Sequence, residues 1–216
     1  MTAKSCVNNK MGWEMLDGKM RLVIDPVLAR LGKAMAASGI SANAVTVAGF
    51  AIGLAAAVAI ANGMMIAGLA LVLVSRLADG LDGAVARASR KTDFGGFLDI
   101  VLDFGFYGMI PFAFVVLDPE ANAVAGGLLL LSFYVNGASF LAYAVMAEKR
   151  ALETSVRGSK SLFFTTGLAE ATETLAVFVG MCLLPQWFNA IAVLFAVVVF
   201  YTALSRIMLA ARNFAG

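Results

Sequence analysis

The sequence predicts an all-α membrane protein with six transmembrane helices, preceded by an amphipathic helix on the cytoplasmic face of the membrane. Hydrophobic residues make up 61% of the chain, which is above the roughly 45–50% of soluble domains. Long apolar runs recur from residue 45 to the C-terminus, each close to the roughly 20 residues that a helix needs to cross a bilayer. The chain therefore has room for several spans and for no hydrophilic domain between them.

The six expected spans follow one another closely. They are predicted near residues 45–61, 64–87, 95–117, 123–147, 162–183 and 188–210. Three of the connections carry turn-forming residues, at Asn62-Gly63, Asp118-Pro119 and Pro185-Gln186.

The segment before the first span has a different pattern. Apolar residues recur at helical spacing over residues 13–37, with charged residues between them. This pattern predicts an interfacial helix, which lies on the membrane or packs against the spans and has Pro26 as a candidate bend. Ser41 or Asn43 is expected to cap the first span.

Lys and Arg residues mark one side of the predicted spans. They precede the first span, join the second to the third and the fourth to the fifth, and follow the sixth, whereas the other three connections contain none. Because short loops rich in Lys and Arg stay in the cytoplasm, both termini are expected to be cytoplasmic.

Four aspartates interrupt the apolar pattern around the connection between the second and third spans. Asp79 and Asp82 are three residues apart, and Asp99 and Asp103 are four apart, so each pair projects from one face of its helix. The connection is short, which makes the two helices antiparallel neighbours and brings the four carboxylates together at the cytoplasmic mouth. Ionisable residues inside a membrane are costly and are by default functional.

A divalent cation would relieve the repulsion among four carboxylates. The chain has no His and no cysteine near this cluster, so the ligands are all oxygen atoms, as suits Mg²⁺, Mn²⁺ or Ca²⁺. Two ions that share carboxylates would match the charge and serve phosphoryl chemistry. Small residues beside the acids would leave room for a nucleotide, and Arg87, with Arg90 or Lys91, could meet its phosphates.

These residues form one compact pattern across two helices. It reads Asp79-x-x-Asp82-Gly83-x-x-Ala86-Arg87, then seven residues, then Gly95-x-x-x-Asp99-x-x-x-Asp103. The pattern closely resembles the signature of the CDP-alcohol phosphotransferase family, and the spans and the N-terminal helix are similar too. The resemblance implies a single domain over residues 1–216. It also implies transfer of a substituted phosphate from a CDP-linked donor to a hydroxyl, release of CMP, and two divalent ions, Mg²⁺ or Mn²⁺, as cofactors.

The resemblance also implies roles for individual residues. Asp79, Asp82, Asp99 and Asp103 would ligate the metals, and Asp103 would double as the general base for the acceptor hydroxyl. The residues implied to bind the nucleotide are Asn43, Thr46, Gly83, Ala86, Arg87 and Gly95. Gly96 also stands beside Gly95, but only Gly95 has the required spacing to Asp99.

For partners and location, the resemblance implies CDP-diacylglycerol as the donor, a small alcohol as the acceptor, and a phospholipid as the product. It further implies surrounding membrane lipids, a homodimer, and the bacterial inner membrane with the active site facing the cytoplasm. No nucleic-acid partner is expected.

Two groups of residues are candidates for binding the acceptor. Lys149, Arg150, Arg157 and Lys160 suit an acceptor with a phosphate, such as glycerol 3-phosphate or inositol phosphate, although membrane topology explains them equally well. The Pro-and-Arg pattern of inositol-phosphate transferases has no clean match here.

Acidic residues in the fifth span form the second group. Glu170 and Glu173 could hold an amine or polyol acceptor, or pair with a buried base such as Arg206. Arg76 could pair with an acid or meet a lipid phosphate.

Three alternatives remain open at this point. Within the family, glycerol 3-phosphate as the specific acceptor would make the protein a phosphatidylglycerophosphate synthase. A divalent-cation transporter and a membrane prenyltransferase belong to other classes. The crowding of the acids on one side argues against a transporter, and the compactness of the motif argues against a prenyltransferase.

Overall fold

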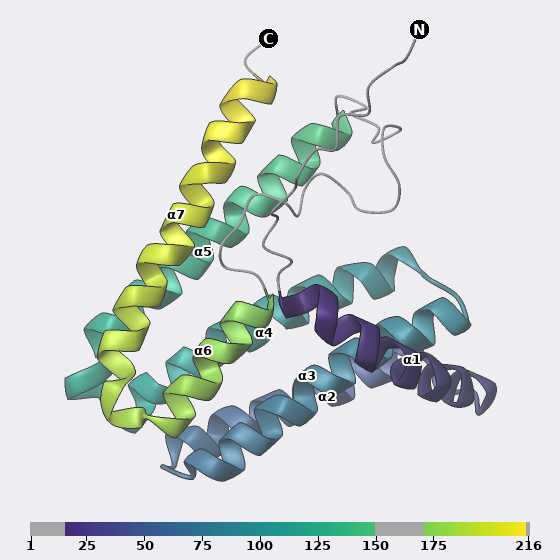
Figure 1. Ribbon diagram of the computed structural model, residues 1–216, viewed down its shortest axis with the longest axis horizontal. Coiled ribbons are helices and arrows are strands. Elements are labelled where there is room, and N and C mark those ends of the chain that lie inside the picture. Colours follow the sequence, from purple (N-terminus) through teal and green to yellow (C-terminus); the bar gives the residue numbers. More distant parts are fainter. Residues whose placement is uncertain (1–15, 150–170, 215–216) are drawn as a thin grey trace, which may run out of the picture.

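The computed structural model describes residues 16–149 and 171–214 (Figure 1). Within these ranges the chain forms seven α-helices and one 3₁₀ turn, and it forms no strand. The helices are α1 (Leu16–Ala37), α2 (Ala42–Ala61), α3 (Met65–Ala88), α4 (Asp93–Leu117), α5 (Pro119–Lys149), α6 (Ala171–Leu183) and α7 (Phe188–Phe214), with the 3₁₀ turn η2 (Pro185–Trp187) before α7.

The described helices have the composition of a membrane protein. Four stretches are long and apolar enough to cross a bilayer, namely α2, α4, α5 and η2 with α7. α3 has a comparable length of 24 residues, but its second half carries the charged residues of the motif. α6 has 13 residues in the described part. The all-α membrane fold is confirmed, while the count of six spans and the interfacial position of residues 13–37 stay predictions.

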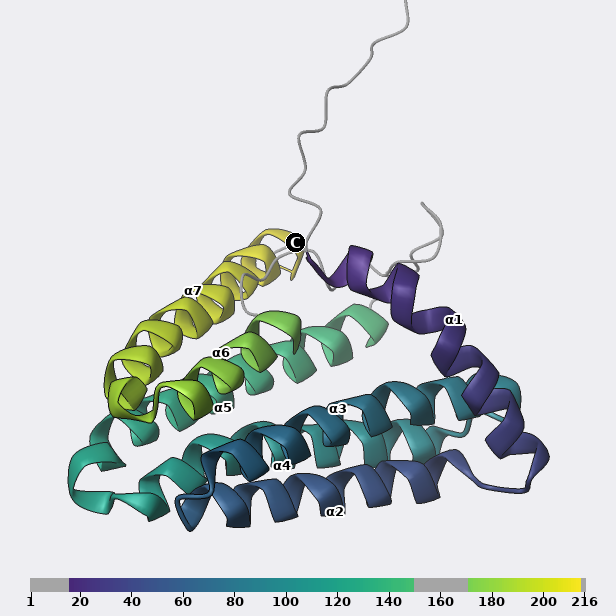
Figure 2. The same cartoon turned by 60° about the horizontal axis from the view of Figure 1, so that its bottom comes forward.

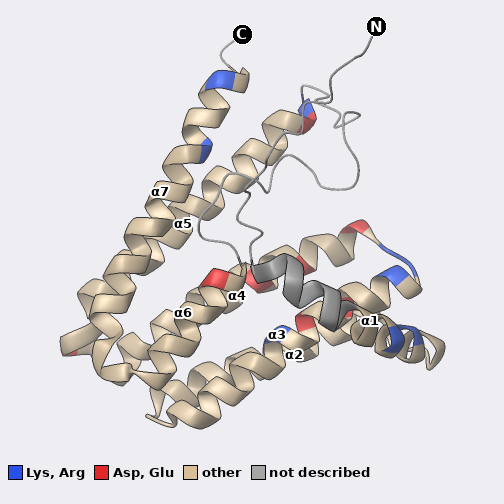
Figure 3. Cartoon of the chain, viewed as in Figure 1, with Lys and Arg blue, Asp and Glu red and all other residues tan. Residues whose placement is uncertain are grey.

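The helices are arranged in two halves. α2 packs against α3 and α4 to form one half, and α5 packs against α7 in the other, as the turned view shows (Figure 2). The halves meet where α4 contacts α5 and α3 contacts α6, and α1 lies across α3. Charged residues gather toward one end of α3 and α4, and long stretches of the helices carry none (Figure 3).

A core of aromatic residues joins the two halves. Phe106, Phe114, Phe178 and Phe188 come from α4, α6 and α7, and their side chains are almost fully buried. Phe114 stacks on Phe188 with the ring centroids 4.7 Å apart, and Phe106 lies 6.3 Å from Phe178. Because these rings dominate the buried area, they fix α4, which carries two of the acids, against the second half.

Local caps and turns set the helix ends beside the acids. Ser41 caps α2 by accepting a hydrogen bond from the Ala44 N–H at 3.2 Å, so of the two predicted caps Ser41 is the one observed. Thr92 caps α4 in the same way, accepting from the Gly95 N–H at 3.0 Å. The turn between α1 and α2 uses Gly39 at φ 79°, a conformation that favours glycine.

Candidate active site

Three of the predicted carboxylates face a pocket between three helices. α2 packs against both α3 and α4, and the pocket lies where the three helices face one another. It has a volume of about 210 Å³, including space open to the surroundings. Its lining consists of Thr46, Gly49 and Phe50 from α2, Ser75, Arg76 and Asp79 from α3, and Asp99, Leu102 and Asp103 from α4.

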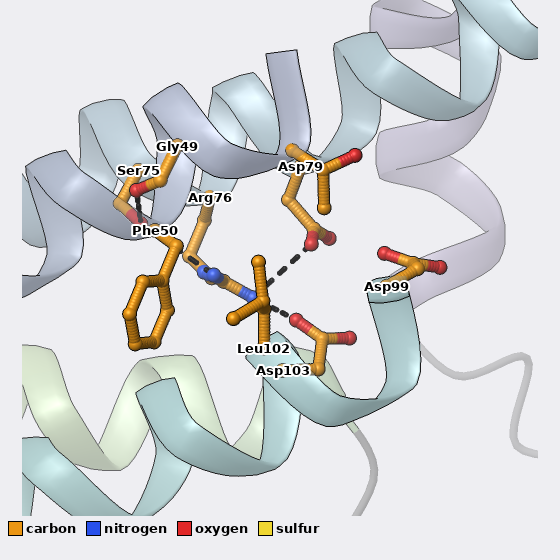
Figure 4. Close-up of a pocket in the computed structure, with 9 residues that line it drawn as sticks. Gly49, Phe50, Ser75, Arg76, Asp79, Asp99, Leu102 and Asp103 are labelled. Carbon is orange, nitrogen blue, oxygen red and sulfur yellow. Dashed lines mark hydrogen bonds and ion pairs between the residues drawn. The ribbon is translucent and has the colours of Figure 1, made fainter. Parts of the chain in front are cut away.

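Three of the four predicted acids come together in this pocket. Asp79, Asp99 and Asp103 point toward one another (Figure 4), and each offers a carboxylate oxygen within 4.8 Å of the others. Asp82 lies outside this group of three. It is buried, and its Oδ2 atom has no hydrogen-bond partner within the described residues.

Arg76 joins the cluster as a permanent cation. Its Nη1 donates to Asp103 Oδ1 at 2.7 Å and lies 3.5 Å from Asp79 Oδ1. The guanidinium also lies over the Phe106 ring, with Cζ 3.6 Å from the ring centroid. The sequence left open whether Arg76 pairs with an acid or meets a lipid phosphate, and the structure pairs it with two acids.

The predicted nucleotide residues fall into two groups around the acids. Asn43 lies beside Gly95, because a Cβ atom added to Gly95 would be 3.0 Å from Asn43 Oδ1. Gly83 lies beside Arg87, whose Nη1 would be 3.3 Å from a Cβ atom at residue 83. Thr46 lines the pocket and donates to the Ala42 carbonyl at 3.0 Å. Ala86 is half-buried one residue before Arg87.

The candidate acceptor residues lie only partly within the described chain. Arg150, Arg157, Lys160 and Glu170 fall outside it. Lys149 is exposed at the end of α5, and it does not line the pocket. Glu173 lies half-buried in the first turn of α6. Acceptor binding by these residues stays a prediction.

Arg206 was a candidate partner for the acidic residues of the fifth span. In the structure it donates to Asn136 Oδ1 at 2.9 Å and to Ser139 Oγ at 2.7 Å, and its pairing with those acidic residues stays a prediction. These bonds tie α7 to α5, which is a packing role.

Several pocket residues were not singled out from the sequence. Ser75 donates to the Gly49 carbonyl at 2.8 Å and thereby locks α3 onto α2. Phe50 and Leu102 supply apolar walls. The sequence did contain one sign of this contact, namely the spacing of Gly49 and Gly53. Small residues four apart allow two membrane helices to approach closely.

The donors in the pocket fit a divalent cation. Three carboxylates whose oxygens lie within 4.8 Å of one another form the hard, all-oxygen ligand set that Mg²⁺ and Mn²⁺ prefer. Asp82 Oδ2, which is buried and has no hydrogen-bond partner within the described residues, also suits a cation or donor, because a buried polar atom without a partner is costly.

The fold and the pocket define a class, namely an all-helical membrane protein with a carboxylate cluster between three helices. The family model described as CDP-alcohol phosphatidyltransferase matches residues 39–209. Because this match covers most of the chain, the protein belongs to the CDP-alcohol phosphatidyltransferase family and is a transferase. A transporter and a prenyltransferase are thereby set aside.

Curated relatives include a membrane protein and a phospholipid-type synthase. The inner membrane protein YnjF of Escherichia coli K12 is 43% identical over 193 residues, which cover 89% of this chain and 94% of the relative. An archaetidylinositol phosphate synthase of Methanothermobacter thermautotrophicus is 28% identical over 195 residues, covering 88% of this chain and 89% of that protein.

Solved structures share the fold. The phosphatidylinositol phosphate synthase of Mycobacterium tuberculosis with CDP-DAG bound has a TM-score of 0.60 and 22% identity, covering 86% of this chain and 94% of that one. The same synthase in complex with manganese and citrate has a TM-score of 0.56, also at 22% identity, and covers 84% of this chain and 87% of that one.

Proposed function

We propose that this protein transfers the phosphatidyl group of CDP-diacylglycerol to the hydroxyl of a small alcohol, in a reaction that needs divalent cations and releases CMP. The observation that carries the proposal is the convergence of Asp79, Asp99 and Asp103 on one pocket of a membrane-embedded transferase. A structure with CDP-DAG and another with manganese in the same fold support the donor and the metal requirement.

In the proposed site, Asp79, Asp82, Asp99 and Asp103 hold two divalent ions, Mg²⁺ or Mn²⁺. When bound, these ions would neutralise the diphosphate of the donor and stabilise charge on its leaving phosphate. The cytidine and its phosphates would lie along the Asn43–Gly95 and Gly83–Arg87 contacts, where a Cβ atom added to either glycine would come within 3.3 Å of a neighbouring side chain. Arg87 would add charge-assisted hydrogen bonds to phosphate oxygens.

In the proposed reaction, Asp103 removes the proton of the acceptor hydroxyl. The hydroxyl oxygen forms a bond to the phosphorus that carries the diacylglycerol, and the bond from this phosphorus to the bridging oxygen breaks. CMP leaves with that oxygen, and the proton stays on Asp103 until it passes to water. A general base of this kind contributes about 10²–10⁴ in rate.

The acceptor has two candidates with phosphate. Glycerol 3-phosphate would make the protein a phosphatidylglycerophosphate synthase. Inositol phosphate is favoured by the names of two relatives, the archaeal synthase described above and a second one from Pyrococcus horikoshii, 38% identical over 86 residues. Either acceptor would suit the basic residues Lys149, Arg150, Arg157 and Lys160.

The test is an acceptor screen with purified protein in lipid nanodiscs. CDP-diacylglycerol and Mg²⁺ or Mn²⁺ are supplied with glycerol 3-phosphate, inositol phosphate, serine, choline, ethanolamine or glycerol, and the new phospholipid is identified by mass spectrometry. One acceptor should yield a lipid product together with an equal amount of CMP. Binding of CDP without product from any acceptor would refute the proposed donor and acceptor classes, and absence of CDP binding would refute the whole proposal.

A further inference from the structure

Arg76 brings a positive charge into the group of residues proposed to hold metal ions. Its Nη1 contacts Asp103 Oδ1 at 2.7 Å and lies 3.5 Å from Asp79 Oδ1. Arg does not lose its proton in proteins, so this charge is permanent. The four aspartates and Arg76 together carry a net charge of −3 when the carboxylates are ionised.

The Arg76 guanidinium is held in place by the buried side chains around it. Its side chain is only 12% exposed, and one face covers the Phe106 ring, with Cζ 3.6 Å from the centroid. Phe106 is itself fully buried and cannot withdraw, because Gly53 packs behind it so closely that an added Cβ atom would be 2.7 Å from Phe106 Cδ2.

The backbone that carries Arg76 is fixed as well. Ser75, the preceding residue, donates to the Gly49 carbonyl at 2.8 Å and ties this turn of α3 to α2. Arg76 Nε is buried with no hydrogen-bond partner within the described residues. Leaving this donor unpaired costs free energy, and two ion pairs, to Asp103 and Asp79, offset that cost.

A cation held by Asp103 would feel this charge strongly. Carboxylate oxygens bind Mg²⁺ or Mn²⁺ at about 2.1 Å, so an ion on either oxygen of Asp103 would lie within about 7 Å of Arg76 Nη1. At that range the repulsion between the guanidinium and a divalent ion is screened little in a partly buried site.

From these contacts we infer that Arg76 is an internal counter-ion of the acid cluster, a positioning residue that competes with divalent cations for Asp103 and Asp79. It neutralises part of the carboxylate repulsion, orients Asp103 toward Asp79, and lowers the affinity of the site for metal. This inference rests on the proposed metal-dependent function, and it adds a residue outside the matched motif that sets how tightly the site binds its ions.

The experiment measures Mn²⁺ affinity rather than turnover. Wild type, R76Q and R76K are purified in nanodiscs, and Mn²⁺ binding is followed by electron paramagnetic resonance and by calorimetry. R76Q should bind Mn²⁺ about tenfold more tightly or better, since it removes a like charge near the ion. R76K keeps the charge and should stay within about twofold of wild type.

Two further variants serve as controls for misfolding and for the loss of any arginine. R76M keeps an apolar contact with the Phe106 ring, so it provides a second neutral variant if R76Q does not fold. R206Q removes an arginine that lies against α5, away from the pocket lining, and should leave Mn²⁺ affinity unchanged. A merely structural role for Arg76 would weaken Mn²⁺ binding in both neutral variants.

The outcomes separate this inference from the proposed function. Mn²⁺ affinity in R76Q or R76M that is equal to or weaker than in wild type would overturn the counter-ion role alone. Weaker CDP binding with unchanged Mn²⁺ affinity would also overturn it and would make Arg76 a phosphate ligand. Wild type that binds neither Mn²⁺ nor CDP would overturn both the inference and the proposed function.

Discussion

Asp82 and Asp103 belong to one motif but have different surroundings. Asp103 pairs with Arg76 and faces the pocket, whereas Asp82 is buried with one oxygen unpartnered within the described residues. In the proposed reaction, Asp103 would accept the proton of the acceptor hydroxyl in the pocket, and Asp82 would act only as a metal ligand.

Substitution of the two acids should separate these roles. Asp103→Asn should lower kcat by about 10²–10⁴ and largely keep CDP affinity, because the proposed nucleotide contacts lie elsewhere. Asp82→Asn should weaken Mn²⁺ and CDP binding together, each by about tenfold or more, since it removes a charge on which both depend. CMP release and calorimetric titration of each variant measure these effects.

The matched control is Asp118→Asn at the other end of α4, where the side chain caps α5 by accepting from the Ala121 N–H at 3.0 Å. This variant should behave as wild type in both assays. Full turnover by Asp103→Asn would remove the proposed base.

Gly95 is the second residue-scale test. An added Cβ atom would lie 3.0 Å from both Asn43 Oδ1 and Thr92 Oγ1, whereas an added Cβ atom at Gly96 would have nothing within 4 Å. Gly95→Ala should therefore lower CDP affinity by about tenfold because it crowds the proposed nucleotide contact. Gly96→Ala is the control and should bind CDP as wild type does, and an equal loss in both variants would contradict the assignment of Gly95.

At the residue scale, the sequence identified the four aspartates as candidate metal ligands, but it did not predict which of them lie close together. The spacing of the four aspartates predicted one shared site, and the structure brings three of them together. The separate position of Asp82 could not be predicted, because the relative height of α3 and α4 depends on how each packs against α2. Likewise, the sequence showed that Arg76 is charged, but it did not predict whether Arg76 would pair with Asp103 or with a lipid phosphate.

At the scale of the elements, the contact of α1 with α3 supports the helix that carries the motif. A Cβ atom added to Gly32 of α1 would lie 2.7 Å from the Ala84 carbonyl carbon, and Ala84 stands between Asp82 and Arg87 on α3. The two helices therefore pack backbone against backbone at the motif, which small residues allow.

Gly32→Ala should push α1 away from α3. The expected cost is about 1–3 kcal/mol of stability, typical of overpacking, with a lower thermal midpoint and weaker CDP binding. Gly127→Ala on α5 is the matched control, because an added Cβ atom there meets nothing within 4 Å. Its midpoint should not fall, since Ala is favoured over Gly inside a helix. An unchanged midpoint in Gly32→Ala would show that α1 is not held at this contact.

Helix positions were predictable within a few residues where apolar runs and caps agree. The span predicted at 64–87 is α3 at Met65–Ala88, and the span predicted at 95–117 is α4, which starts two residues earlier at its Thr92 cap. The span predicted at 123–147 is part of α5, which extends over Pro119–Lys149. The polar ends of α5 were missed because the spans were predicted from apolar runs, and an apolar run ends where the helix leaves the lipid. The helix itself begins earlier, at Pro119, because Pro is well tolerated at the first position of a helix.

At the scale of the whole molecule, the charge pattern predicts that both termini and the acid cluster face the cytoplasm. Alkaline phosphatase fused after Gly63 should be active. That turn would lie outside the cytoplasm, where the disulfides that the phosphatase needs can form. The same enzyme fused after Gly216 should be inactive, and a fluorescent protein at that position should fluoresce. The reverse pattern would place the proposed site on the wrong side for a cytoplasmic nucleotide.

This member of the family is proposed to need a divalent metal and to use a CDP-linked lipid. The most direct measurement is CMP release by the purified protein from CDP-diacylglycerol, with and without an acceptor and with and without a chelator. Release should need both the acceptor and Mg²⁺ or Mn²⁺, and it should be lost in Asp103→Asn. Acceptor-dependent release that survives complete chelation of metal would contradict a metal-dependent mechanism.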